Sequence, residues 1–287
     1  MRFVTEAEVA TVLELPRLIE LMRATMIDFS AGRSVQPVRA RMAHERGLFM
    51  SMPAYTGALG MKVLTFNRQH PMQAVMVMFD AVSGAPTALM EAETITALRT
   101  AAVSAVATDL LAPADVSVLT IMGTGLQARS HIEALRCVRQ FDEVRVWGRT
   151  PPHAERLADE MNAKAVLDPA TAVRDADVVA TVTGARQPIL FGAWLSQGAH
   201  VNAVGAPSPT WRELDDAAMR GRLYVDSVAG AVEESGDIIG SGAEVYAEIG
   251  AALAGEVEVD PNESTIFKSL GMGIQDVATA DYVLTRL

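Results

Sequence analysis

From residue 116 onward, short apolar runs alternate with amphipathic stretches of helical length. Buried parallel strands read as continuous runs of Val, Ile and Leu because both of their faces are covered. Alternation of such runs with helices is typical of βαβ units and predicts a Rossmann-type, doubly wound parallel sheet. The predicted strands are residues 116–122, 144–147, 177–182, 200–204 and 223–226, and the predicted helices are 126–139, 152–161 and 213–220.

The first hundred residues follow another pattern. Apolar positions at helical spacing predict one or two helices over residues 6–29. Beyond them lie extended segments at 48–50, 61–67 and 74–79, separated by turn residues such as Pro53 and Gly57. This part of the chain is predicted to be an α+β segment with its own sheet.

The two patterns predict two domains in an α/β protein. A strongly patterned helix over residues 94–111 is expected to link them, and the tail from residue 276 is expected to be helical. We place the first domain at residues 1–107 and expect a C-terminal helix at 275–287. A dinucleotide-binding domain then occupies residues 108–274.

Composition narrows the classes of function. The chain has 287 residues and a formal net charge of -11, and its basic residues are scattered, which disfavours nucleic-acid binding. It contains no uninterrupted apolar stretch of the roughly 18 residues that a transmembrane helix needs, so no membrane span is expected. The first twelve residues lack the basic-then-apolar layout of a secretory signal, and we expect a cytoplasmic protein.

A single cysteine limits the metal and redox chemistry. Cys137 alone permits neither an intrachain disulfide nor a thiolate-based zinc site, and no metal site is predicted. Because Cys137 lies within a helical pattern, we expect it to be a small core hydrophobe.

A dinucleotide fingerprint follows the first predicted strand of the second domain. In Gly123-Thr-Gly125-Leu126-Gln127-Ala128, the first glycine permits a tight turn and the second lets the backbone approach a pyrophosphate. Ala128 lets the helix pack closely on the strand. Its position between a strand and a helix favours cofactor binding over the alternative, a glycine turn without a ligand.

The end of the second predicted strand indicates which cofactor is preferred. An NAD-binding protein usually has Asp or Glu there, about twenty residues after the fingerprint, to hold the ribose 2′-hydroxyl. This chain has Arg149 and Thr150, which can donate hydrogen bonds to a 2′-phosphate. We therefore expect NADPH, with weaker use of NADH; the alternative is that Arg149 is a solvated surface residue.

Three basic residues of the first domain are open to two interpretations. Lys62 alternates with Leu64 and Phe66 in an extended segment, so it either reaches water along apolar surface or faces a site that uses its charge. Arg39 and Arg99 have the same ambiguity, and a surface position is the default for any single arginine.

Taken together, these segments resemble the ornithine cyclodeaminase/mu-crystallin family over nearly the whole chain. The resemblance runs through Gln36-Pro-Val-Arg39, Met52-Pro-Ala-Tyr55, Lys62-Val-Leu-Thr65, Ile95-Thr-Ala-Leu-Arg99-Thr-Ala-Ala-Val-Ser104, the Gly123 fingerprint, Pro188-Ile-Leu-Phe-Gly192, Val201-Asn-Ala-Val-Gly205, Trp211-Arg-Glu-Leu-Asp-Asp216, Leu223-Tyr-Val-Asp-Ser227, Glu234-Ser-Gly-Asp237, Ser241-Gly-Ala-Glu244 and Phe267-Lys-Ser-Leu-Gly271.

The resemblance implies a homodimer that acts on a small imino acid, in which residues 1–107, joined by the C-terminal helix at 275–287, form the dimerisation and substrate domain. By this analogy Arg39 and Lys62 hold the substrate carboxylate, and Glu234 lies near the substrate. Glu234 or Lys62 would stabilise or supply the proton of an iminium. For Glu234 the alternative is an exposed helix carboxylate beside Glu233.

The same analogy implies further cofactor contacts. Arg99 and Thr100 would touch the phosphates, whereas Thr183, Val204 and the loop of Ser269, Leu270 and Gly271 would line the nicotinamide.

Two departures from the family bear on the reaction. Cyclodeaminases carry a glutamate where this chain has Met50 and a catalytic aspartate where it has Pro207. Without these acid/base groups, direct cyclodeamination is doubtful, and the resemblance to ketimine reductases implies NADPH-dependent reduction of the C=N bond of a small cyclic imino acid. An alanine-dehydrogenase-like reductive amination and a non-catalytic ligand-binding role are the alternatives. Hormone-binding relatives have Ser-Arg where this chain has Pro207-Ser208, which makes a hormone role less favoured.

Overall fold

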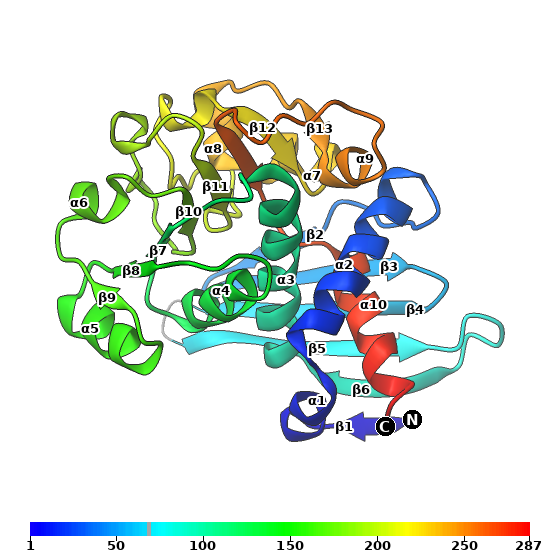
Figure 1. The fold of residues 1–287 in the computed structure, drawn as a ribbon. Coiled ribbons are helices and arrows are strands. Elements are labelled where there is room, and N and C mark those ends of the chain that lie inside the picture. The colour runs from blue at the N-terminus through cyan, green and yellow to red at the C-terminus, as the bar shows by residue number, and fades with distance from the viewer. Residues whose placement is uncertain (68–69) are drawn as a thin grey trace. The chain divides into compact units, whose positions relative to one another are not determined.

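The computed structural model describes residues 1–67 and 70–287 and divides into two compact units. Unit 1 comprises Met1–Arg99 and Gly271–Leu287, and unit 2 comprises Thr100–Leu270. The chain passes from the first to the second along helix α3 (Glu93–Leu111), as the predicted linking helix requires. The boundaries that we predicted from sequence, after residues 107 and 274, lie further along the chain than these divisions. Figure 1 shows both sets of elements.

Unit 1 is built on a six-stranded sheet of order β1-β6-β5-β4-β3-β2. Neighbouring strands are antiparallel except for β1 and β6, which are parallel. The extended segments predicted in this region lie in β3, β4 and β5, which confirms the α+β prediction. The strands are β1 (Arg2–Val4), β2 (Ala40–His44), β3 (Gly47–Tyr55), β4 (Leu59–Asn67), β5 (His70–Phe79) and β6 (Pro86–Glu91).

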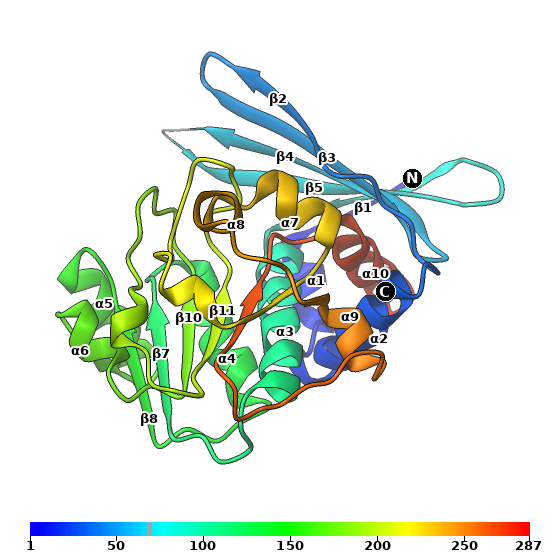
Figure 2. The same ribbon diagram turned by 90° about the horizontal axis from the view of Figure 1, so that it is seen from above.

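Two helices, α2 (Leu15–Ser30) and α10 (Gly273–Leu284), pack together, and α10 lies against β3, β4 and β5 (Figure 2). Side chains alternate across a pleated strand, so every second residue of the sheet faces these helices. Lys62 and Leu64 of β4 are on this buried face together with Met76 of β5. The predicted helices at residues 6–29 are α1 (Glu6–Val12) and α2.

The opposite side of this sheet, which we call the outer sheet face, stays partly exposed although it is apolar. Phe3 is 54% exposed and Phe49 is 38% exposed. Between them in the register lie side chains of intermediate burial. The outer sheet face consists of Phe3, Phe49, Met61, Val63, Val75, Val77 and Leu89.

Unit 2 contains the predicted parallel sheet, with eight strands in the order β13-β12-β14-β11-β10-β7-β8-β9, and every pairing is parallel. Five strands coincide with the predicted apolar runs, and β9, β13 and β14 were not predicted. The strands are β7 (Val118–Met122), β8 (Glu143–Trp147), β9 (Lys164–Ala165), β10 (Val178–Thr181), β11 (His200–Ala203), β12 (Arg222–Val225), β13 (Ala247–Glu248) and β14 (Thr265–Lys268).

The helices of unit 2 connect these strands. Helices α4 and α5 were predicted within a few residues of their observed bounds. The helices are α4 (Leu126–Arg136), α5 (Pro151–Glu160), α6 (Pro169–Val173), α7 (Val228–Glu234), α8 (Gly236–Ser241) and α9 (Ile249–Leu253), and the 3₁₀ turns are η1 (Gly192–Trp194) and η2 (Ala218–Arg220).

Two sequence-based predictions in this unit are wrong. Residues 213–220 do not form an α-helix: only the short turn η2 is helical, because the carbonyl of Glu213, which would accept the first hydrogen bond of such a helix, accepts from the N–H groups of Ile189 and Leu190 instead. Leu214 also forms an isolated parallel bridge with Leu190. Cys137 is exposed at the C-terminal end of α4, so it is not a core residue.

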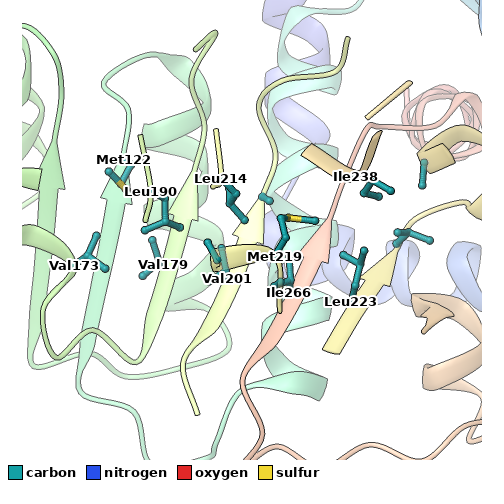
Figure 3. Packing of buried hydrophobic residues seen from close by; sticks show 14 of the residues in the cluster. Met122, Val173, Val179, Leu190, Val201, Leu214, Met219, Leu223, Ile238 and Ile266 are labelled. Carbon is teal, nitrogen blue, oxygen red and sulfur yellow. The ribbon is translucent and has the colours of Figure 1, made fainter. Parts of the chain in front are cut away.

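The core of unit 2 fills the space on one side of the sheet (Figure 3). Val179, Val201, Leu223 and Ile266 come from four strands that lie side by side in the sheet, and each is at most 1% exposed. Met219 from η2 packs against the same cluster. These strands therefore form a rigid platform whose carboxyl ends can hold side chains in fixed positions.

One described helix, α3, has the length and apolar composition of a membrane span. Its most apolar window is 78% buried within the structure. Burial of this extent is what the core helix of a globular protein shows.

Candidate active site

The turn after β7 requires glycine at its first position. Gly123 has φ +144°, and a Cβ there would lie 2.7 Å from Cγ2 of Val182. Its N–H donates to the carbonyl of Trp147 at the end of the neighbouring strand β8. The turn is thus held tightly between the strands on either side, as the fingerprint predicts.

Helix α4 begins directly after this turn with a free N-terminus. Gly125 is its N-cap, no side chain caps it, and its first turn has no acidic residue. No atom lies within 4 Å of the position where a Cβ of Gly125 would be, so an anion has room to approach. Ala128 is fully buried and lets the helix pack against β7. Free N–H groups and the helix dipole favour a phosphate here, with Leu126 and Gln127 in the first turn.

The end of β8 presents Arg149 and Thr150 to solvent. Within the described ranges, no salt bridge engages Arg149, so its guanidinium is available to a ligand. Helix α5 begins with Pro151 and Pro152, which have no N–H to donate. The first two residues of this helix therefore offer no backbone N–H to a phosphate.

The strand order shows where the rest of a dinucleotide would lie. Six strands, β9-β8-β7-β10-β11-β14, reproduce the doubly wound order 3-2-1-4-5-6, with the reversal between β7 and β10. The fingerprint half takes the adenosine, so β10, β11 and β14 belong to the nicotinamide half. Thr183, Val204 and Ser269 follow these three strands, and the structure brings them together at one edge of the sheet.

A buried polar network that the sequence did not reveal lies under this edge. It joins Glu213, Asp237 and Lys268, each fully buried, and we call it the Glu213 network. Lys268 Nζ is 2.8 Å from Asp237 Oδ2, and Asp237 also accepts from the N–H of Glu213. Burial raises the pKa of Glu213, although Lys268 and the Thr183 and Thr181 hydrogen bonds oppose the shift.

Glu234, the last residue of α7, is buried with 5% exposure, whereas Glu233 beside it is exposed. The alternative of a solvated helix carboxylate for Glu234 is therefore wrong. Thr100, where unit 2 begins, is also buried.

Unit 1 contains a second constellation of charges. Lys62 is 1% exposed, and its Nζ lies 2.7 Å from Oδ2 of Asp276 on α10. Arg99 places its Nε 2.8 Å from the other oxygen of the same carboxylate and donates to Gln275. Arg39 donates to the carbonyl of Gly271. We call Arg39, Lys62, Arg99 and Asp276 the cationic cluster.

Within this cluster Lys62 and Arg99, two cations, share one carboxylate, that of Asp276. Burial lowers the pKa of Lys62 to about 7; Asp276 opposes this shift, and Arg99 and Arg39 reinforce it. A second anion close to Lys62 would offset the excess positive charge, so the cluster suits a ligand that carries a carboxylate. Lys62 therefore faces charged partners and does not reach water, which settles the alternatives that its alternation left open.

Asp276 is the member of this cluster that sequence reasoning missed. It lies in a predicted helix, where a carboxylate is ordinarily solvated, and its partners are 177 and 214 positions away along the chain. Among the residues that the structure describes, no group of His, Cys, Asp and Glu side chains is suited to hold a metal ion.

The fold and these residues define a dinucleotide-binding protein with a separate cationic cluster for an anionic ligand. The sequence pattern of the ornithine cyclodeaminase/mu-crystallin family matches residues 1–287, and the chain belongs to this family. It is 44% identical over 283 residues to the ketimine reductase mu-crystallin of Mus musculus, which covers 93% of this chain and 90% of that one.

Two solved structures are similar along their whole length. One is the Δ1-pyrroline-2-carboxylate reductase of Thermococcus litoralis in complex with NADH and L-proline, at 31% identity and a TM-score of 0.96, covering 100% of this chain and 97% of that one. The other is an archaeal alanine dehydrogenase dimer with bound NAD, at 28% identity and a TM-score of 0.93, covering 99% and 95%.

Proposed function

We propose that this protein is an NADPH-dependent reductase of the C=N bond of small cyclic imino acids, such as pyrroline- or piperideine-2-carboxylate. The observation that carries the proposal is the cationic cluster, in which Lys62 is buried yet charged groups surround it. Its excess positive charge matches the carboxylate that these substrates carry. The ketimine reductase and pyrroline-2-carboxylate reductase relatives support the same reaction.

Each residue of the site has its own role in the proposed reaction. Arg39 and Lys62 bind the substrate carboxylate and orient the imine carbon, which recovers part of the barrier through positioning. When bound, the reduced nicotinamide supplies a hydride to that carbon. The imine nitrogen must be protonated to accept it, and Lys62, with a pKa of about 7, can supply or retain this proton at neutral pH. Glu234 is the second candidate for that proton.

Three residues support NADPH as the preferred cofactor. Arg149 is exposed, carries no salt bridge among the described residues and stands where an NAD-binding protein usually has an acid. Thr150 follows it and offers a hydroxyl donor, whereas Pro151 has no backbone N–H to donate. The two solved relatives contain NADH and NAD, so strictness for NADPH is the part of the proposal that depends on this chain alone.

Replacing Arg149 with alanine is expected to raise the KM for NADPH by about 10- to 100-fold, because a charge-assisted bidentate contact to the 2′-phosphate is lost. The KM for NADH should change less than threefold. Steady-state kinetics with both cofactors measures the ratio of the two KM values. Arg156→Ala, at an exposed position of the adjacent helix α5, serves as the control. An equal increase in the KM for both cofactors would show that Arg149 does not bind the 2′-phosphate.

The outer sheet face supports a homodimer. It combines large apolar side chains with partial exposure, a combination that usually marks an interaction surface. A second copy of the chain, pairing this face with its own, would remove that surface from water, and the alanine dehydrogenase relative is described as a dimer. Sedimentation velocity tests this directly, since a monomer at micromolar concentration would contradict the proposal.

Reductive amination of a 2-oxo acid is the second candidate function, because an alanine dehydrogenase shares the fold along its whole length. The deciding experiment follows NADPH and NADH oxidation with a panel of cyclic and linear imino acids, and with pyruvate plus ammonium. Preference for the cyclic imines supports the proposal. Turnover only with pyruvate plus ammonium favours the second candidate, and cofactor binding without turnover favours a ligand-binding protein.

A further inference from the structure

The turn that follows β10 is held by a single buried carboxylate. Oε1 of Glu213 accepts from both the N–H and the hydroxyl of Thr183, each at 2.6 Å. Its Oε2 accepts from the hydroxyl of Thr181 at 2.8 Å. Because the Thr183 hydroxyl also accepts from the N–H of Ala185, this turn has little freedom to change its conformation.

The turn that follows β11 is packed against the same carboxylate. A Cβ on Gly205 would lie 2.2 Å from the carbonyl oxygen of Thr183 and 2.4 Å from the carboxylate of Glu213. The carbonyl of Gly205 accepts from Lys268 Nζ at the end of β14. Glu213 and Lys268 therefore connect the ends of three neighbouring strands.

Asp237 holds the other members in place. Oδ1 accepts from the N–H groups of Glu213 and Leu214, and Oδ2 forms the ion pair with Lys268. Each charged side chain is buried: Asp237 and Lys268 pair with each other, and the carboxylate of Glu213 accepts from Thr181 and Thr183 while it interacts with the charge of Lys268. An apolar core would hold the strands together at a lower desolvation cost, so a requirement for fixed geometry at this edge is the better explanation.

We propose that Glu213, Asp237 and Lys268 are positioning residues for hydride transfer: they fix the turns after β10 and β11 that carry the nicotinamide. The inference rests on the proposed function, because it assigns the network to the reduced nicotinamide that this function requires. The residues act through Thr183 and the backbone near Gly205 and do not themselves contact the substrate.

Glu213→Gln is the primary test. The amide keeps the size of the side chain but removes the negative charge that interacts with Lys268 and replaces one acceptor oxygen with a donor, so the hydrogen bond with the Thr181 hydroxyl must reverse its direction. We expect kcat for imine reduction to fall about 10- to 100-fold, because a small misplacement of the reacting atoms slows hydride transfer by such a factor. The Kd for NADPH should change less than threefold. The primary isotope effect on kcat with 4-deuterated NADPH should rise, because hydride transfer becomes more nearly rate-limiting.

A control for loss of stability lies at the other end of the same strands. Thr265→Val removes the buried hydrogen bond to His200 at the start of β14, and it should lower the melting temperature without changing kcat or the isotope effect. If Glu213→Gln does not fold, Thr181→Val removes one donor to the same carboxylate and should give a smaller effect in the same direction.

The outcomes distinguish the proposed function from the positioning role of Glu213. If the wild type binds no NADPH, or binds it and reduces no imino acid, the proposed function fails. If it binds NADPH without reducing an imino acid, the fluorescence emission of bound NADPH is compared between the wild type and Glu213→Gln. An altered nicotinamide environment at an unchanged Kd then supports the positioning role. If the wild type reduces imines and Glu213→Gln, or Thr181→Val in its place, keeps the wild-type kcat and isotope effect, the positioning role is overturned.

Discussion

Lys62→Met is expected to lower kcat/KM for imine reduction by about three orders of magnitude. In the proposed mechanism the substitution removes the charge that binds the substrate carboxylate and a proton donor, and general acid catalysis by such a donor contributes about 10²- to 10⁴-fold. Because the fingerprint, Arg149 and the ends of β10 and β11 belong to unit 2, NADPH affinity should stay within threefold of the wild type. Steady-state kinetics and fluorescence titration of NADPH measure the two quantities.

Lys164→Met is the matched control, because this lysine is exposed on β9 and pairs with Glu143 at a surface site. It should retain full activity. In the wild type, kcat/KM should fall as the pH rises through about 7, because burial lowers the pKa of Lys62 to that value and the protonated form is required. A flat profile from pH 6 to 9, or unchanged turnover in Lys62→Met, would remove Lys62 from the mechanism.

Asp276→Asn should destabilise the protein by about 3–5 kcal/mol, because it leaves the buried cations of Lys62 and Arg99 without their shared carboxylate. Whatever folded enzyme remains should show its pH inflection below that of the wild type, since Asp276 is the group that raises the pKa of Lys62. Urea unfolding gives the first quantity and a pH series of kcat/KM gives the second.

Asp281→Asn, an exposed position on the same helix α10, is the control and should change the free energy of unfolding by less than about 0.5 kcal/mol. The double variant Lys62→Met/Asp276→Asn isolates the pair. Its destabilisation should be smaller than the sum of the two single variants, because the second substitution removes a charge that the first left unpaired. Strict additivity would mean that the two side chains do not interact.

The fold was predictable where the signal is local. Continuous apolar runs identified β7, β8, β10, β11 and β12, and the glycines and Ala128 marked the turn between β7 and α4. β9 and β13 have two residues each and carry no periodicity. β14 ends in Lys268, a polar residue whose burial makes sense only beside Asp237, 31 positions away.

The site was less predictable, because its partners are distant in sequence. Residues 213–220 have helical spacing, yet the carbonyl of Glu213 accepts from the N–H groups of Ile189 and Leu190, more than twenty positions earlier in the chain. Alternation placed Lys62 on one face of β4, but it could not show that α10 covers that face with Asp276. The family resemblance indicated Arg39, Lys62 and Glu234. Only the three-dimensional structure revealed the carboxylates of Asp276, Glu213 and Asp237 that bind neighbouring site residues.

The two prolines at the start of α5 bear on how cofactor choice evolves in this fold. Since the peptide backbone contributes no donors at positions 151 and 152, the discrimination between the two dinucleotides that we propose would depend on the side chains of Arg149 and Thr150. A lineage that exchanges those two residues can change its source of reducing power while the rest of the enzyme is preserved.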